Sequence, residues 1–216
     1  MASTIDLIKE LREKTGSGLM DCKKALAECD NDINKSIEWL RKKGIATAEK
    51  KSSRTAAEGI VCSYIHGGGT VGVLLEVNIE TDFAAKNEQF QEMCRNIAMQ
   101  IAAMNPSWVR REEVPEDVLK REEDIVSTQA RNEGKPEQII DKIVAGRLEK
   151  FYAENCLMEQ SYIRDEDKTI DQLVKEMIAY IGENIQVRRF TRYELGEGIE
   201  KKEECFLDEV KKQLNG

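Results

Sequence analysis

The side chains that most often do chemistry in proteins are sparse in this sequence. The 216 residues contain one histidine, His66, and six cysteines, none of which forms a Cys-x-x-Cys pair. Cys62 and His66 lie four residues apart on a predicted strand, so they would share a face about 13 Å apart, too far for a nucleophile and its base. A zinc site needs more histidine or paired-cysteine ligands than the chain offers. The sequence therefore predicts no catalytic residue, no metal site, no cofactor and no enzymatic bond chemistry.

Two glycine-rich segments resemble catalytic loops only superficially. Gly67-Gly68-Gly69 joins two predicted strands and carries no Lys-Ser/Thr pair, whereas a phosphate-binding loop of that kind opens a helix. Gly16-Ser17-Gly18 has no apolar strand before it, which the turn of a hydrolase nucleophile would require. The many carboxylates show no spacing that pairs two of them in a cleft. We therefore interpret the chain as a protein that works by binding.

Charge and hydropathy narrow the choice of partner. The net charge is -8 and the isoelectric point is about 5.0, which disfavours a protein that binds nucleic acid through its phosphates. The pattern shows neither a membrane-spanning apolar run nor a secretory signal. Cys22 and Cys94 fall on apolar helical stripes, where reduced cysteine packs as a small hydrophobe. We expect a cytoplasmic protein with reduced cysteines, no membrane contact and no direct nucleic-acid binding.

Phe83 lies where a predicted strand ends. Apolar residues alternate with other residues along Val71–Ile79, and the alternation stops at Thr81. Phenylalanine is usually buried, but here Asp82 precedes it and Lys86 follows one turn later. These polar neighbours favour an exposed ring on a rigid strand exit, which would make a good interface anchor.

The N-terminal segment is predicted to form a bundle of three short helices. Ser3 or Thr4 would cap the first helix, and Gly44 would end the third. Leu19 shares a helical stripe with Cys22, whereas Met20 stands off that stripe. Met20 would either pack against the following linker or offer an adaptable contact to a partner, and the pattern does not separate the two.

A basic stretch, Arg41–Arg54, follows the bundle. It is either a solvated, partly helical hinge or a contact for nucleic acid or the ribosome, and we favour the hinge. We expect a three-helix domain with its basic linker over residues 1–52 and a core domain over residues 53–216.

The core domain is predicted to be α+β. Two strands around a glycine-rich hairpin turn and a third strand near the C-terminus give a three-stranded antiparallel sheet with flanking helices. A capping box at Thr169 and Gln172 begins a helix that Gly182 ends. The predicted strands are Ile60–His66, Val71–Ile79 and Ile185–Leu195, and the predicted helices span residues 87–104, 115–132, 136–155, 169–182 and 203–214.

Three segments carry a resemblance to a known family. Glu76–Asn87, with its Thr-Asp-Phe turn after a Glu-Val-Asn strand, and Leu11–Leu26 are similar to signature segments of elongation factor Ts, and Gly196–Lys201 extends the similarity. The resemblance implies a ubiquitin-associated-like bundle followed by the core of that family. Longer members carry the strand-rich core twice and some insert a coiled-coil hairpin. This chain resembles a short form with a single core copy and no such insert.

The resemblance also implies a function. Members of the family promote release of GDP from the translation GTPase elongation factor Tu, and a wedge that disturbs its magnesium and phosphate contacts would do so without bond chemistry. The alternative is a ubiquitin-associated-like adaptor that docks on RNA or a ribosome without exchange activity. The resemblance assigns three contacts to elongation factor Tu: the wedge loop Thr81, Asp82, Phe83 and Ala84, the GTPase-domain grip Leu19 and Met20, and the hairpin tip His66 and Gly67.

The single core copy favours a homodimer, because a second copy would come from another chain. The sheet gives a further reason. Leu74, with Tyr64 or Ile65 according to the register, would leave apolar residues on the face opposite the core stripe. The competing expectation is a monomer in which the helices between Pro115 and Asn155 fold back over that face.

Overall fold

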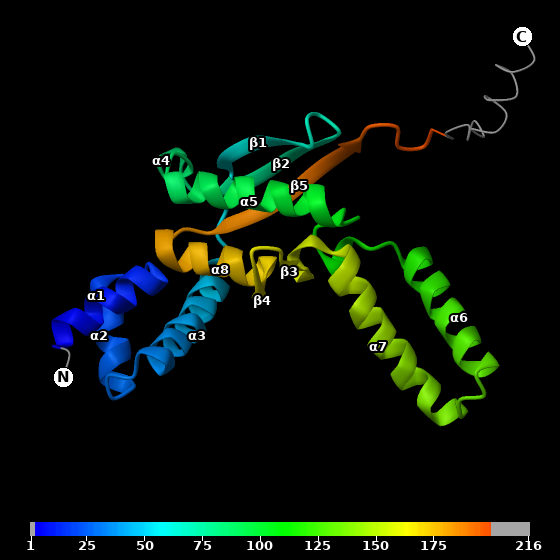
Figure 1. Cartoon of the computed structure of the whole chain (residues 1–216), viewed down its shortest axis with the longest axis horizontal. Coiled ribbons are helices and arrows are strands. Elements are labelled where there is room, and N and C mark those ends of the chain that lie inside the picture. Colours follow the sequence, from blue (N-terminus) through cyan, green and yellow to red (C-terminus); the bar gives the residue numbers. More distant parts are fainter. Residues whose placement is uncertain (1–2, 200–216) are drawn as a thin grey trace, which may run out of the picture.

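The computed structural model describes residues 3–199, so the helix predicted over residues 203–214 lies outside it. A helical bundle at one end joins a three-stranded sheet backed by helices, and a helical hairpin projects at the other end (Figure 1). The α+β architecture expected from the sequence is confirmed. The sheet is antiparallel and contains, in spatial order, β1 (Glu58–His66), β2 (Val71–Ile79) and β5 (Ile185–Glu194).

The N-terminal bundle is built from three helices, α1 (Thr4–Thr15), α2 (Leu19–Glu28) and α3 (Ile33–Lys51). Ser3, and not Thr4, caps α1, because its hydroxyl accepts a hydrogen bond from the Asp6 amide while the Asp6 carboxylate accepts one from the Ser3 amide. The three helices enclose a small core of their own that consists of Leu11, Cys22, Ala25, Leu26 and Leu40.

The third helix is longer than the sequence predicts. α3 has 19 residues and continues past Gly44, so the prediction that Gly44 ends this helix is wrong. Gly44 is buried against Ala179 of α8 (Ile170–Ile181), and Ala48, one turn further, is 2% exposed within the main core. Tertiary packing thus overrides the local glycine signal. The second half of α3 forms an interface with the core domain and is not a solvated hinge.

One face of the sheet is buried, as the alternation along β2 predicts. Its core residues Val73, Leu75, Val77 and Ile79 are at most 2% exposed. Two helices, α5 (Glu88–Met104) and α8, lie along this face (Figure 1). The strand exit that leads to Phe83 therefore follows directly from the main core.

The opposite face of the sheet is open within the described residues. Ile65, Gly72 and Tyr193 form one row across the three strands, and the side chains of Ile65, Tyr193 and Leu74 are exposed. In this register the side chain of Ile65 lies on the open face, whereas that of Tyr64 packs against the core. The apolar second face that the sequence predicts is confirmed.

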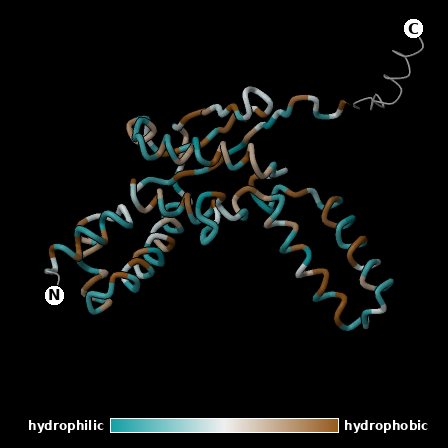
Figure 2. Tube along the Cα trace, in the orientation of Figure 1, coloured by the Kyte–Doolittle hydropathy of each residue, from teal (hydrophilic) through white to brown (hydrophobic). Residues whose placement is uncertain are grey.

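Two helices, α6 (Glu116–Asn132) and α7 (Glu137–Asn155), pack against each other and project away from the sheet (Figure 1). Val126, Ala130 and Ile140 are buried between them, and hydrophobic residues recur along both helices (Figure 2). The expectation that these helices fold back over the open face is therefore wrong. The sequence predicts both helices but not their pairing into a projecting hairpin.

A second sheet, which the sequence analysis did not predict, connects the hairpin to α8. It contains β3 (Ser161–Tyr162) and β4 (Asp165–Thr169), and the buried Gln100 side chain of α5 donates a hydrogen bond to the Ser161 carbonyl at 3.0 Å. Thr169 then caps α8 in a capping box with Gln172, and Gly182 ends the helix, both as predicted.

Candidate partner-binding surface

Phe83 lies on the one-turn helix α4 (Asp82–Ala85), shortly after β2. Its side chain is 83% exposed, whereas Phe90, seven residues further along, is 0% exposed in the main core. The prediction of an exposed ring at this strand exit is confirmed, and the buried alternative is excluded. A large aromatic side chain that the described residues leave exposed is the kind of group that anchors an interface.

The turn that carries Phe83 is held by its neighbours. The Thr81 hydroxyl caps α4 by accepting a hydrogen bond from the Ala84 amide at 3.2 Å. Ala84 is buried in the main core, while Thr81, Asp82 and Phe83 are exposed. The Lys86 ammonium donates a hydrogen bond to the Asp82 carboxylate at 2.9 Å and holds the pKa of that carboxyl below its ordinary value. Ala84 therefore anchors the turn, and the other three residues are available for contact.

Leu19 and Met20 are the first two residues of α2, which begins after Gly18. Both side chains are exposed, and that of Met20 is 70% exposed. Leu19 was predicted to share a helical stripe with Cys22, but only Cys22 is buried in the bundle core, and the side chain of Leu19 is exposed. The exposure of Met20 also excludes its packing against α3. Two adjacent apolar side chains thus remain free on the surface.

A groove of about 580 Å³ lies between these two regions. Its walls include the Gly16–Gly18 turn before α2, Phe83 and Ala84 on α4, and Tyr180 near the end of α8. Gly16 suits this turn because its φ of 65° is left-handed, and it lies beside the Tyr180 ring, which a β-carbon there would contact at an ordinary 3.5 Å. The structure therefore brings the turn that carries Phe83 and the turn that precedes α2 to one groove, and Leu19 and Met20 follow directly after its wall.

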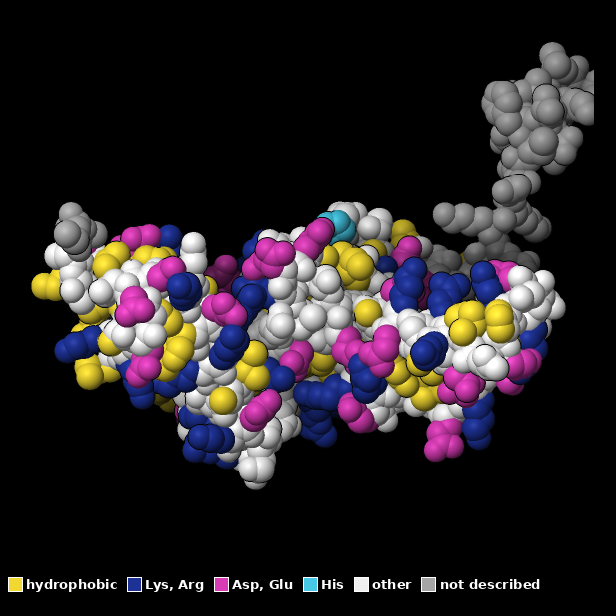
Figure 3. Space-filling view, turned by 90° about the horizontal axis from the view of Figure 1, so that it is seen from below, with side chains coloured by type: hydrophobic (Ala, Val, Ile, Leu, Met, Phe, Trp, Pro, Cys, Tyr) yellow, Lys and Arg dark blue, Asp and Glu magenta, His cyan; other side chains and the backbone are white. Residues whose placement is uncertain are grey.

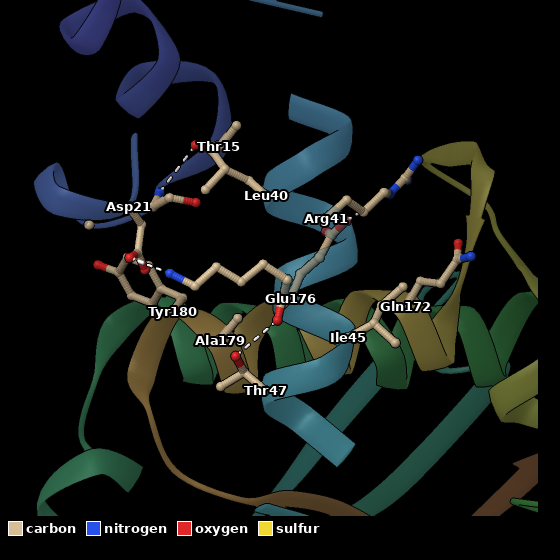
Figure 4. Close-up of a pocket in the computed structure, with 14 residues that line it drawn as sticks. Thr15, Asp21, Leu40, Arg41, Ile45, Thr47, Gln172, Glu176, Ala179 and Tyr180 are labelled. Carbon is tan, nitrogen blue, oxygen red and sulfur yellow. Dashed lines mark hydrogen bonds and ion pairs between the residues drawn. The ribbon is translucent and has the colours of Figure 1, made fainter. Parts of the chain in front are cut away.

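Tyr180 also lines a second, smaller cavity of about 120 Å³ between the bundle and α8 (Figure 4). The Lys43 ammonium of α3 pairs there with the Asp21 carboxylate of α2, and Arg41 lies 3.4 Å from Glu176 of α8. These ion pairs connect α3 to both of its neighbours. They line this cavity and offer no pairing of a nucleophile with a base.

The third predicted contact, His66 and Gly67, lies away from the groove. His66 pairs with Val71 at the hairpin end of the sheet, whereas Phe83 follows the other end of the nine-residue strand β2. A strand of that length spans about 30 Å. At the tip, the Tyr64 hydroxyl lies 3.0 Å from His66 Nδ1, and the two rings stack. The structure does not bring this pair to the groove.

Two residues of the site were missed by the sequence analysis. Tyr180 falls off the apolar stripe of α8 that includes Ile178 and Ile181, so a bulky aromatic outside a core stripe was the available signal. Glu183 follows the glycine that ends α8 and carries no local signal. Its contact with Thr81 joins residues 102 positions apart, which no local pattern can predict.

The groove is lined by apolar side chains and also by charged side chains. Within residues 3–199, no group of three or more His, Cys, Asp or Glu side chains is placed to hold a metal ion. No helix in that part of the chain is long and apolar enough to cross a membrane. A helical bundle and a sheet domain that meet at a groove, with Phe83 and Met20 exposed near it, are typical of a protein that binds a partner.

Comparison with known proteins then gives the family. The family model described as Elongation factor TS matches residues 7–197. The chain is 58% identical over 213 residues to Elongation factor Ts of Acetivibrio thermocellus, with 99% of each chain covered. It is 59% identical over 208 residues to that of Desulforamulus reducens, with 96% of each covered, and 59% identical over 197 residues to that of Moorella thermoacetica, with 91% of this chain and 97% of the relative covered. The chain belongs to the elongation factor Ts family and is a translation elongation factor.

Proposed function

We propose that this protein is a guanine-nucleotide exchange factor of the cytoplasm. It binds elongation factor Tu in its GDP-bound or nucleotide-free form, and it promotes GDP release by disturbing the magnesium and phosphate site of that GTPase. It acts by binding and makes or breaks no bond, so the magnesium ion and the nucleotide belong to the partner and the chain needs no cofactor. The observation that carries the proposal is the 83% exposure of Phe83 on a turn whose backbone is fixed.

Phe83 supplies binding energy that is realised only when the partner accepts its ring. Full burial of a phenylalanine side chain contributes about 1.5–3 kcal/mol. The ring weakens GDP binding only if it prefers a partner conformation in which the magnesium ligands are displaced, because a ligand shifts an equilibrium by its differential affinity. Linkage then requires GDP to weaken the complex by the same factor. A ring on a turn anchored by Ala84 suits this wedge role better than one on a flexible loop.

Leu19 and Met20 supply the second contact in this proposal. They are exposed at the start of α2, which directly follows one wall of the groove. A GTPase segment that enters the groove would meet both contacts at once, so the bundle would hold the partner while the wedge loop acts on it. The hairpin tip at His66 and Gly67, about 30 Å away, would then contact a different part of the partner.

The adaptor alternative requires free basic groups on Arg41–Arg54 that could reach nucleic acid. Several of these groups are instead paired within the protein, and the underside of the molecule shows basic and acidic side chains intermixed (Figure 3). The Lys51 ammonium donates a hydrogen bond to the Gly182 carbonyl. The remaining ion pairs in this stretch include Arg41–Glu176, Lys42–Glu38, Lys43–Asp21 and Arg54–Glu80. This pairing favours the exchange factor.

We further propose that two copies of the core domain pack through the open face of the sheet. Val61, Ile65, Leu74 and Tyr193 are exposed on that face, and α6 and α7 project away from it (Figure 1). A second copy of the same face would bury these residues in a symmetric interface. The dimer would carry two wedge loops and two grooves.

Release of fluorescently labelled GDP from elongation factor Tu, with and without this protein, tests the proposed function. We expect acceleration that saturates with protein concentration and changes little between low and moderate salt, because the wedge contact is apolar. The adaptor alternative expects no acceleration, together with RNA binding that weakens steeply as salt rises. A release rate that does not change with added protein would contradict the proposal.

A further inference from the structure

Three successive residues join α8 to β5, and each contacts a segment far away in the sequence. The first, Gly182, ends α8 in a left-handed conformation with φ of 86°. Its carbonyl accepts a hydrogen bond from the Lys51 ammonium at the end of α3. The turn at residues 182–184 is therefore bound directly to the last residue of the helix that continues from the N-terminal bundle.

Asn184 connects the end of α3 to the end of β2. Its side chain is 1% exposed and donates hydrogen bonds to the carbonyls of Ser52, at 3.3 Å, and Arg54, at 2.7 Å. Its backbone amide donates to the Glu80 carboxylate at 2.6 Å. Arg54 closes the cycle, because its guanidinium lies 3.6 Å from the same carboxylate. Because the polar groups of the buried Asn184 are hydrogen-bonded to both segments, this residue holds the end of α3 and the end of β2 at a fixed separation.

Glu183 holds the wedge loop itself. Its carboxylate accepts two hydrogen bonds from Thr81, one from the backbone amide at 3.0 Å and one from the hydroxyl at 2.8 Å. The same hydroxyl accepts the capping hydrogen bond from the Ala84 amide. Because a carboxylate makes stronger hydrogen bonds than a neutral acceptor, Glu183 sets the direction in which α4 leaves the strand.

From these contacts we infer that Glu183 is a positioning residue for nucleotide exchange. It fixes the direction of Phe83 relative to the N-terminal bundle, and it does so through its two hydrogen bonds with Thr81. The exposed ring of Phe83 has little packing of its own to hold it, so its place depends on the backbone that Glu183 and Asn184 hold. This inference rests on the proposed function, in which Phe83 is the wedge.

The test compares Glu183→Ala, Glu183→Gln and the control Glu166→Ala, which removes an exposed glutamate on β4. We expect Glu183→Ala to lower the maximal rate of GDP release from elongation factor Tu about tenfold, while the half-saturating concentration changes by less than about twofold, because the grip by the bundle is retained. Glu183→Gln keeps one acceptor oxygen for the Thr81 amide and should fall between Glu183→Ala and the wild type. The control should match the wild type.

Hydrogen exchange of the Thr81 amide in the free protein gives a second measurement that does not depend on the partner. We expect this amide to exchange about tenfold faster in Glu183→Ala, while the amides of the bundle core keep their protection. If Glu183→Ala does not fold, the same comparison in Glu183→Gln decides the question, with smaller changes in the same direction.

The outcomes separate the inference from the function on which it rests. An unchanged Thr81 amide exchange rate would overturn the positioning role. So would a faster amide exchange with an unchanged maximal release rate, provided that Phe83→Ala slows release. If Phe83→Ala also leaves release unchanged, the proposed wedge fails, and the positioning inference fails with it.

Discussion

Gly44 on α3 faces Ala179 on α8 so closely that a β-carbon at Gly44 would lie 3.3 Å from the β-carbon of Ala179. At this contact α3 of the N-terminal bundle packs directly against α8, which lies along the buried face of the sheet. The groove is formed partly by the bundle and partly by the core, so its width depends on this packing. A larger residue at position 44 must push the two helices apart.

Gly44→Leu should therefore destabilise the protein, whereas Gly146→Leu on α7 should not. A leucine at Gly44 overfills a closed contact and costs about 1–3 kcal/mol of unfolding free energy. Gly146 is also helical, but within residues 3–199 no atom outside its own helical backbone lies within 4 Å of a β-carbon built there, so the gain in helix propensity, about 0.5–1 kcal/mol, should dominate. Urea unfolding of both variants measures the difference. Equal stabilities would show that the α3–α8 contact is loose in solution.

Met20→Ala should weaken binding to elongation factor Tu without destabilising the bundle. Met20 is exposed at the start of α2, so its removal leaves no cavity, and the loss of an apolar anchor should raise the dissociation constant about tenfold. Isothermal titration with nucleotide-free elongation factor Tu gives the constant. The matched control is Ile5→Ala, an exposed aliphatic residue on α1, which should leave the constant unchanged. Equal effects of the two variants would remove Met20 from the interface.

Two buried thiols should resist alkylation in the native protein at about pH 8. Burial raises the pKa of the Cys156 thiol to about 11 from an ordinary value of 9.0 and also raises that of Cys94. The raised pKa keeps these thiols protonated, so the thiolate fraction of Cys156 should be about 100-fold lower than that of an ordinary cysteine. Mass spectrometry after iodoacetamide treatment should show modification of the half-exposed Cys29 before that of Cys94 and Cys156. Rapid native modification of Cys94 would contradict the core packing, and full modification is expected in urea.

Leu74→Asp should prevent self-association if the open face of the sheet is the dimer interface. The change places a charge among the exposed apolar side chains of the open face, and burial of an unpaired carboxylate is costly. Sedimentation at micromolar concentration should give twice the chain mass of 24.6 kDa for the wild type and a single chain mass for the variant. The control Ile125→Asp on α6, also at an exposed position, should remain dimeric. A wild-type mass of one chain at every concentration would exclude the dimer.

Local patterns were sufficient for much of the fold. The alternation along Val71–Ile79 predicts the buried face of the sheet, and the capping box at Thr169 predicts the start of α8. Each of these two patterns consists of residues that lie within a few positions of one another in the sequence. Phe83 was predicted correctly for the same reason, because its polar neighbours follow directly after the end of an apolar alternation.

Long-range packing explains the predictions that failed. Gly44 carries the local signal of a helix end, but contact with Ala179 keeps it inside α3. Leu19 fits the stripe of α2 and yet lies beyond the reach of the bundle core. Glu183 became visible only when the fold placed it beside Thr81. In each case the deciding contact joins separate elements, so no local pattern contains it.

Release of GDP from elongation factor Tu by Phe83→Ala tests the central claim most directly, with Phe90→Ala as the comparison for a buried ring. We expect Phe83→Ala to reduce the maximal release rate at least about tenfold and to change the unfolding free energy by no more than about 0.5 kcal/mol. Phe90→Ala should lose about 3–5 kcal/mol of stability, because its ring is 0% exposed. Wild-type release rates with Phe83→Ala in a folded protein would contradict the account.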